Sequence, residues 1–392
     1  MKSFLSVTTF AVVISFLLIV APATLQAQLG TSDLDGRVNT VFTSIPFLRI
    51  NPDGRTGGMG DVGLATPVDP AAMYHNASKL AFAENELGFS LTYTPWLREL
   101  VNDIYVAYLS GYKKIDDLQA MGLQIRYFSL GNIQFTDING GDAGQYSPNE
   151  FAADLGYARK LSDKFSTGIT LKYVRSDLAQ GQEVGSGNII KAAQAAAADV
   201  SFFYQNKIDM FDKPATLSFG TAITNIGNKV SYTEDEVKDF IPINWGLGTG
   251  LKLELDEYSS ILIAADINKL LVPTPDTTAT GDFRNKPLLS GMFGSFSDAP
   301  GGASEELQEL MYSFGLEYWY KEQFSLRLGH FNEHRLKGNR KYLTVGLGLR
   351  YSVFGLNFSY IIPTSNQRNP LDNTLRFSLT FDFDGKIKDA DL

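Results

Sequence analysis

The chain has 392 residues, 44% of them hydrophobic and 20% charged, with 36 glycines, 27 phenylalanines, 18 tyrosines and no cysteine. Its mean hydropathy is close to zero, which excludes a bundle of membrane-spanning helices. A formal net charge of −9 argues against a nucleic-acid partner, and the lack of cysteine excludes disulfides, thiolate zinc sites and cysteine nucleophiles. Many aromatics and glycines at near-zero hydropathy are typical of a β-rich chain with one apolar face.

Residues 1–27 are predicted to form a secretory signal peptide. Lys2 supplies a positive charge, an apolar stretch follows over 4–20, and small residues end the segment at Ala27. A retained membrane anchor is the alternative, but the apolar core is short and no basic residues follow it. We therefore expect an exported protein.

The next segment, residues 28–86, is rich in Gly, Pro, Asp and Asn and has no sustained period of 2 or 3.6. One helix is expected over 70–82, with Asp69 as its N-cap and Pro70 at its first position. We expect a compact, turn-built unit. Its glycine-rich turn contains Gly57, Gly58, Gly60, Asp61 and Gly63.

From Leu87 onward, apolar and polar residues alternate strictly. Leu87, Phe89 and Leu91 share one parity, which predicts a strand with one apolar face. The pattern recurs to the end of the chain. It predicts fourteen strands, near 87–93, 103–110, 121–129, 150–159, 165–175, 197–205, 215–224, 244–254, 259–268, 311–320, 324–331, 341–351, 354–362 and 374–383.

Twelve charged residues lie inside these strands, each on the parity opposite to the apolar set. They are Arg126, Asp154, Lys172, Asp199, Lys252, Glu254, Asp266, Glu317, Arg327, Arg350, Arg376 and Asp382. In a soluble sandwich or propeller this parity would face solvent. In a membrane barrel it faces the lumen, because an outward Arg or Lys at the bilayer midplane costs about 2–4 kcal/mol. The equal numbers of acids and bases favour internal salt bridges over an ion-selective pore.

The connections between strands alternate between long and short, except for the first pair, 94–102 and 111–120. Aromatic residues also gather near strand ends, as they do in the interfacial girdles of outer-membrane barrels. The sequence therefore predicts an all-β fold, a 14-stranded antiparallel transmembrane β-barrel over 87–383. An N-terminal hatch, 28–86, is expected to enter from the periplasm and fill the lumen, with a C-terminal periplasmic tail at 384–392.

The glycine run contains a G-x-G-x-x-G pattern at Gly58, Gly60 and Gly63, which occurs in dinucleotide-binding folds. Here no buried strand precedes it, and Pro67 and Pro70 interrupt the helix that should follow. The pattern is therefore interpreted as a set of tight turns or close backbone contacts, and no cofactor is expected.

Two small groups of polar residues suggest a metal. His330, Glu333 and His334 are close in sequence, but no nucleophile motif or further ligand at a defensible spacing accompanies them or His75. Residues 234–236 with Asp239 could hold calcium loosely, yet lack the spacing and glycine of a calcium loop. These residues are interpreted as polar loop positions, so no metal and no catalytic residues are assigned.

The longest outward connection, 270–310, carries apolar residues in a Gly/Ser-rich context. They are Leu288, Leu289, Met292, Phe293 and Phe296. Apolar residues exposed on a loop would form a protein-contact surface. The alternative is that they fold down over the barrel mouth, and both interpretations remain open.

Four stretches of unusual residues, 44–63, 75–79, 93–97 and 127–133, resemble the PorV family of the type IX secretion system, which is related to the FadL barrels. The general layout matches over the whole mature chain. One departure is Ala77-Ser78, where the family's His-x-Asn-Pro stretch has Asn-Pro. The resemblance implies a fourteen-stranded barrel with an N-terminal hatch in the outer membrane, in contact with its lipids.

The resemblance also implies a function without catalysis. Such proteins bind the C-terminal signal domains of secreted cargo proteins, associate with the translocon pore SprA and deliver cargo to an attachment complex that contains the PorU sortase. Contacts are expected on the outward loops 130–149 and 270–310. The alternatives are a FadL-like transporter of hydrophobic small molecules, which needs an apolar tunnel, and an outer-membrane hydrolase, which needs a catalytic dyad at the rim.

Overall fold

The computed structural model describes residues 40–95, 103–136, 140–179, 181, 183–184, 188–233, 237–275, 283–364 and 374–383. The predicted signal peptide and C-terminal tail, and the first residues of the predicted hatch, lie outside these ranges. No helix in the described part of the chain is long and apolar enough to cross a membrane.

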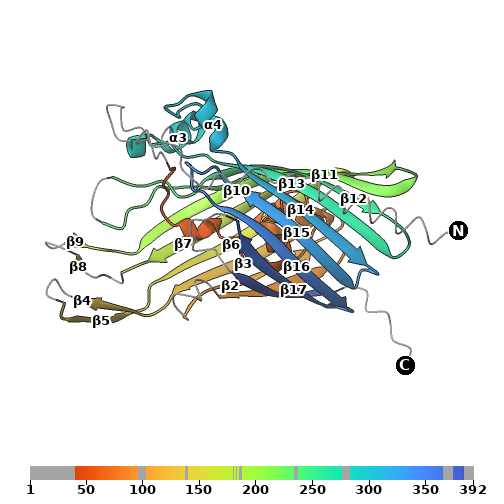
Figure 1. Cartoon of the computed structure of the whole chain (residues 1–392), viewed down its shortest axis with the longest axis horizontal. Helices are drawn as coiled ribbons and strands as arrows, with labels where there is room; N and C mark the ends of the chain where they lie inside the picture. The colour runs from red at the N-terminus through yellow and green to blue at the C-terminus, as the bar shows by residue number, and fades with distance from the viewer. Residues whose placement is uncertain are drawn as a thin grey trace. The chain divides into compact units, whose positions relative to one another are not determined.

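Within the described residues, fourteen antiparallel strands close into a barrel (Figure 1). Each strand pairs with its neighbours in the chain, and β1 closes the sheet on β18 with Leu87 opposite Phe383 and Tyr93 opposite Phe377. The strands are β1 Leu87–Pro95, β2 Ile104–Lys114, β3 Gln119–Leu130, β6 Asn149–Ser162, β7 Phe165–Asp177, β10 Ala193–Met210, β11 Lys213–Gly227, β12 Asn244–Glu254, β13 Ser259–Leu270, β14 Met311–Tyr320, β15 Phe324–Asn332, β16 Lys341–Tyr351, β17 Phe354–Pro363 and β18 Leu375–Phe383.

All fourteen strands expected from the alternation are confirmed, and two connections differ from the prediction. Residues 115–118 alone join β2 to β3, so the first pair of connections also follows the rule of long then short. Strands β10 and β11 extend to a tight turn at Phe211 and Asp212, both with positive φ. Such a left-handed pair matches the twist of a hairpin, which lets the strands continue to the turn.

The two faces of the wall have opposite chemistry, as strand β1 illustrates. Leu91 is 52% exposed on the outer face, whereas Ser90, Thr92 and Thr94 are buried on the inner face. Exposed leucines and aromatics recur on the outer parity of the other strands, including Leu171 on β7 and Ile263 on β13. An apolar outer band with a polar interior is the arrangement of a barrel in a lipid bilayer.

Residues 40–86, hereafter the plug, lie inside the barrel except at their two ends. They form the 3₁₀ helix η2 (Pro46–Arg49), the short helix α2 (Gly54–Gly57) and the 3₁₀ helices η3 (Ala72–Tyr74) and η4 (Ala77–Phe82). The prediction of a single helix over 70–82 is therefore wrong. Asn76 interrupts it, because its side chain accepts a hydrogen bond from Ser78 N and donates to Leu64 O.

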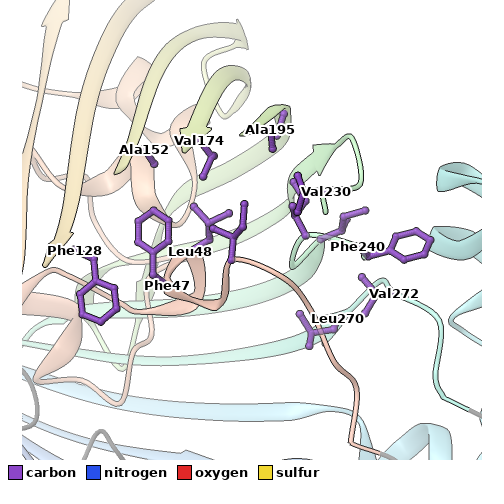
Figure 2. Packing of buried hydrophobic residues seen from close by; sticks show 14 of the residues in the cluster. Phe47, Leu48, Phe128, Ala152, Val174, Ala195, Val230, Phe240, Leu270 and Val272 are labelled. Carbon is purple, nitrogen blue, oxygen red and sulfur yellow. The ribbon is translucent and has the colours of Figure 1, made fainter. Parts of the chain in front are cut away.

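The plug runs from the end of the barrel that carries the long connections to the end that carries the short turns. Near its start, Phe47 stacks on Phe128, and both belong with Leu48 and Phe240 to the buried cluster at the long-connection end, which we call the mouth (Figure 2). Near its end, Leu80 belongs to a cluster at the opposite end of the barrel. The expected entry of the hatch from the periplasmic side concerns residues 28–39, which lie outside the described residues, so it stays a prediction. The described plug starts at the mouth and ends at the short-turn side.

The long connections carry further elements at the mouth (Figure 1). Two hairpins extend there, β4 Ile133–Thr136 with β5 Asp142–Tyr146 and β8 Glu183–Val184 with β9 Asn188–Ile189. The connection between β13 and β14 contains η5 Phe283–Asn285, α3 Leu288–Gly294 and α4 Ala303–Gln308. The candidate site must therefore be sought in the plugged lumen and on these outward elements.

Candidate functional site

The glycine-rich turn forms the part of the plug that lies closest to the wall. Asp53 caps the four-residue helix α2, accepting hydrogen bonds of 2.8 Å from both Thr56 N and Thr56 Oγ1. Gly60 has a φ of 68°, in the left-handed region that favours glycine. Since no strand leads into this helix, the run lacks the βαβ setting of a dinucleotide site.

Glycines on the wall face glycines of the plug. A Cβ at Gly329 of β15 would overlap Gly60 N, and a Cβ at Gly315 of β14 would lie 2.7 Å from Met59 O. Side chains at these wall positions would force the plug backbone to move. The glycines that lower the mean hydropathy of the strands therefore allow the plug and the wall to pack backbone against backbone.

A buried ion cluster joins the plug to the wall. Arg55 contacts Glu317 of β14 through two hydrogen bonds of 2.8 and 2.9 Å, and donates to Asp69 of the plug at 2.8 Å. Arg327 of β15 donates to the same Glu317 at 2.7 Å. Arg55 and Arg327 thus share one carboxylate, and losing that carboxylate would leave two buried cations without it.

Three further contacts tie the plug to the wall. Asp266 of β13 accepts hydrogen bonds from Gly63 N at 2.8 Å and Leu64 N at 3.0 Å. Arg376 of β18 donates to Asn51 O at 2.9 Å. On β16, the hydroxyl of Tyr342 donates to Asp61 at 2.6 Å. The plug is therefore held from β13, β16 and β18 as well as from β14, which makes it an integral filling of the lumen.

The twelve strand charges fall into two groups. Eight of them are buried: Arg126, Asp154, Lys172, Asp199, Asp266, Glu317, Arg327 and Arg376. The other four, Lys252, Glu254, Arg350 and Asp382, lie at the short-turn ends of their strands and retain exposure. Lys252 pairs with Glu254 at 2.8 Å, and the guanidinium of Arg350 lies over the ring of Trp319.

A second buried cluster lies on β3, β6, β7 and β10, on the other side of the lumen. Lys172 lies 3.2 Å from Asp199 and 3.7 Å from Asp154, and donates to Asn225 at 2.7 Å. Arg126 approaches Asp154 at 3.5 Å. This cluster is formed largely within the wall, and Arg126 reaches the plug through Leu48 O at 3.2 Å.

Among the described residues, the lumen has one cavity toward the mouth and another toward the short turns, and plug residues line both. The cavity toward the mouth has a volume of about 120 Å³ and is lined by Arg49, Asp61 and Arg126 among others. The cavity toward the short turns has a volume of about 260 Å³, and Asp69 and Arg350 belong to its lining. Both linings are rich in charge, unlike the apolar tunnel that a transporter of hydrophobic molecules needs.

The candidate contact loop divides into a buried side and an exposed side. Met292 is buried in the mouth cluster and Leu288 packs against it. Leu289, Phe293 and Phe296 are exposed. The ring of Phe296 also meets Trp245 of β12 edge to face, with centroids 6.0 Å apart.

Ion pairs fasten the α4 part of the same connection to the barrel rim. Lys269, at the end of β13, pairs with Glu306 at 2.9 Å and with Glu309. Lys337, in the connection between β15 and β16, pairs with Glu309 at 3.0 Å. Thr274 Oγ1 also donates to Glu309 at 2.7 Å. These buried contacts hold the connection in one position over the mouth.

The start of the plug is clamped at the mouth by Glu333, which accepts from Arg340 at 2.8 Å and from Arg49 at 3.3 Å. Burial opposes ionisation of Glu333, but the guanidinium groups of Arg340 and Arg49 outweigh it and lower its pKa. Sequence reasoning missed Arg49, Arg55 and Arg340. A lone cation within a glycine-rich run, such as Arg55, is the signal that could have found one of them.

The candidate metal ligands do not converge in the described part of the chain, where no three His, Asp or Glu side chains are placed to share an ion. Glu333 is engaged by the two arginines, and burial together with Lys341 and Lys337 lowers the pKa of His334. His75 lies 3.3 Å from Thr56 within the plug. Of the acidic loop, residues 234–236 lie outside the description, and Asp239 is 3.8 Å from Arg284.

Comparison with protein families gives a match to the model described as "Type IX secretion system protein PorV", over residues 33–277. The match spans more than half of the chain. The chain belongs to the PorV family. It is therefore a type IX secretion system protein, and its barrel with an apolar outer face is integral to the outer membrane. Transport and secretion, not an enzyme class, characterise this PorV-family barrel.

Comparison with solved structures finds several barrels similar to this PorV-family chain at low sequence identity. The toluene transporter TbuX of Ralstonia pickettii is 13% identical, with a TM-score of 0.46 over 85% of this chain and 98% of that one. The toluene transporter TodX of Pseudomonas putida is 13% identical, with a TM-score of 0.48 over 84% and 96%. A FadL homologue of Pseudomonas aeruginosa is 12% identical, with a TM-score of 0.44 over 88% and 99%. No curated protein matches the chain.

Proposed function

We propose that this barrel binds the C-terminal signal domains of secreted cargo proteins and carries cargo from the translocon pore SprA to the surface attachment complex that contains the PorU sortase. Membership in the PorV family supports this role within type IX secretion. The observation that carries the proposal is the pairing of a filled lumen with a helix at the mouth that exposes large apolar side chains.

Helix α3 is anchored to the mouth through its buried side. Met292 anchors the helix in the mouth cluster, and Gly291 lies against the ring of Phe240, where a Cβ would come within 2.7 Å. Leu289 and Phe293 remain exposed on this anchored helix. Rigid, exposed apolar side chains are typical of protein-contact surfaces, because their burial by a partner is favourable and little conformational entropy is lost.

The orientation follows from the lengths of the connections. Long connections of outer-membrane barrels lie outside the cell and short turns lie in the periplasm. The mouth, with α3 and the two hairpins, would then face outward, where exported cargo emerges. Strand β18 would then end at Phe383 on the periplasmic side.

The FadL-like transporter is the alternative, and the linings of the two cavities argue against it. Arg49, Arg126 and Lys172 line the cavity near the mouth, and Arg55 and Glu317 line the other. A hydrophobic molecule would have to pass these charges and the plug, at an unfavourable cost in desolvation.

The test is a variant carrying Leu289→Ser, Phe293→Ser and Phe296→Ser. Substitution is preferable to deletion of 285–297, which would also remove the anchor Met292. Leu307→Ser on α4 is the matched control, because Leu307 and Phe293 are each 64% exposed on the same connection. We expect the triple variant to trap cargo in the periplasm and to retain less than a tenth of the cargo or SprA in pull-downs.

Both variants should show the heat-modifiable gel mobility of a folded barrel. Normal secretion and normal pull-down by the folded triple variant would show that the exposed side of α3 does not contact cargo or SprA. In a deletion strain, periplasmic cargo supports the carrier role. Normal export combined with lost uptake of lipophilic compounds would overturn it in favour of the transporter.

A further inference from the structure

The cavity near the mouth has a wall of unusual charge. Four cationic side chains line it, Arg49, Arg126, Lys172 and Arg340, against a single carboxylate, Asp61. Both oxygens of Asp61 already accept hydrogen bonds, from Asn51 Nδ2 at 2.8 Å and from the Tyr342 hydroxyl at 2.6 Å. The one carboxylate of the lining is therefore already engaged on both oxygens.

The carboxylates that balance these cations lie behind the lining. Glu333 accepts from both Arg49 and Arg340, and Asp154 and Asp199 lie beside Lys172. None of these three acids lines the cavity. In each ion pair the cationic residue therefore lines the cavity and the carboxylate does not, which favours binding of an anion in the cavity.

Arg126 is a lining residue with an unused donor. It is buried, yet its Nε has no hydrogen-bond partner among the described residues, and its contact with Asp154 is long at 3.5 Å. Its guanidinium lies 5.3 Å from the ring of Tyr74 and 5.8 Å from that of Phe47. These rings and the hydrogen bond to Leu48 O hold the group in place beside the cavity.

Size and access restrict the ligand. A volume of about 120 Å³ is well below the roughly 300–1,000 Å³ of pockets that take drug-sized ligands, so it suits a small group such as a carboxylate. A sugar or a lipid chain would need considerably more room. Toward the mouth, the side chains of Arg49 and Arg340 are 22% and 21% exposed, so the lining is reachable by solvent.

We propose that this cavity binds a carboxylate of the cargo signal domain, presented from the mouth while the domain rests on the outward loops. The inference rests on the proposed function and adds a chemical determinant to it. The carboxylate belongs either to the C-terminus of the cargo or to an Asp or Glu side chain of an inserted segment. Arginine forks recognise both groups in the same manner.

The experiment measures the affinity of the purified full chain in nanodiscs for a cargo signal domain. Three forms of the domain are compared: the native form, a form with an amidated C-terminus, and forms with single Asp→Asn or Glu→Gln changes. We expect one class of change to weaken binding about tenfold or more. If amidation of the C-terminus weakens binding, the carboxylate is that of the C-terminus. If an Asp→Asn or Glu→Gln change weakens binding, the carboxylate is that side chain.

The barrel variants connect that effect to the cavity. Arg126→Gln should weaken binding of the native domain about tenfold and abolish the difference between native and neutralised forms, whereas Arg126→Lys should keep part of it. Ala222→Leu fills the cavity without removing a charge and should have the same effect as Arg126→Gln. Arg350→Gln is the control, because Arg350 is a lumen arginine that lines the other cavity and lies over the ring of Trp319, outside the Glu317 cluster.

The failures of the two proposals are distinguishable. If the signal domain binds equally well in every neutralised form, the carboxylate site is wrong while cargo binding stands. Equal loss of the native and the neutralised forms in Arg126→Gln would also overturn the site. If no signal domain binds, the proposed function fails, and acetate alone then tests the cavity. Acetate should raise the melting temperature of the wild type but not of Arg126→Gln, and no difference would overturn the site.

Discussion

Arg55 of the plug donates hydrogen bonds to both carboxylate oxygens of Glu317 on strand β14, from Nε to Oε2 at 2.9 Å and from Nη2 to Oε1 at 2.8 Å. The two residues are 262 positions apart in the chain, and both are buried in the lumen. Because Arg327 shares the same carboxylate, the plug and two neighbouring strands depend on one charge.

Removing that charge should be costly. Glu317→Gln leaves Arg55 and Arg327 facing each other in a buried site, and we expect a loss of about 3–5 kcal/mol in the free energy of unfolding. Urea unfolding in detergent micelles, followed by tryptophan fluorescence, measures it. Lys252→Met is the control, since its pair with Glu254 is 32% and 42% exposed and should contribute about 0–1 kcal/mol. Similar losses in both variants would contradict the assigned role of the Glu317 cluster.

Backbone packing between plug and wall predicts a second effect. Gly329→Val should displace the plug, because a side chain at this position overlaps the backbone at Gly60. We expect faster proteolysis within residues 50–66 and a lower melting temperature, while the barrel itself still forms. Gly294→Ala is the control, since no atom lies within 4 Å of its added Cβ. An unchanged protease pattern in Gly329→Val would show that the plug tolerates the side chain.

The path of the plug is testable by labelling, because the chain has no cysteine of its own. Phe42 lies at the mouth and is 68% exposed, whereas Glu84 is exposed at the short-turn end. We expect Phe42→Cys to react with a membrane-impermeant maleimide in intact cells, and Glu84→Cys only after the outer membrane is permeabilised. Leu64→Cys, at a buried position, should react in neither case. The reverse pattern for the first two would contradict the direction of the plug or the orientation of the barrel.

The clamp at the mouth should depend on pH. Pairing with Arg340 and Arg49 lowers the pKa of Glu333 from its usual value of 4.5 against the effect of burial. When folding lowers the pKa of a carboxyl group, the ionised group stabilises the folded state at pH values above the pKa that it has in the unfolded chain. This stabilisation is lost as the pH falls through the pKa of the folded state. The melting temperature of Glu333→Gln should therefore lie below that of the wild type at neutral pH, and the gap should close at pH values below 4.5. A gap independent of pH would mean that packing, not charge, sets the effect.

The contact loop illustrates how far a pattern in the sequence reaches. Leu288, Leu289, Met292, Phe293 and Phe296 stand out as apolar residues in a Gly/Ser-rich connection, and the sequence leaves both burial and exposure open. The structure divides them, because consecutive positions of helix α3 point to different sides, so Met292 enters the mouth cluster and Phe293 is exposed. The helix over 70–82 failed for a related reason, since the Asn76 side chain competes for the backbone groups that a continuous helix would use.

The sequence by itself determined the wall of this protein. Alternation with period 2 sets which face of each strand is apolar, so fourteen strands and a membrane barrel follow from local patterns such as that of Leu87 to Tyr93. Only the tertiary structure decided what fills the barrel and in which direction. The plug has no periodic signal, and its contacts, such as Arg55 with Glu317 and Gly60 with Gly329, join residues more than 260 positions apart. Such pairings depend on the closure of the whole barrel, which no local pattern encodes.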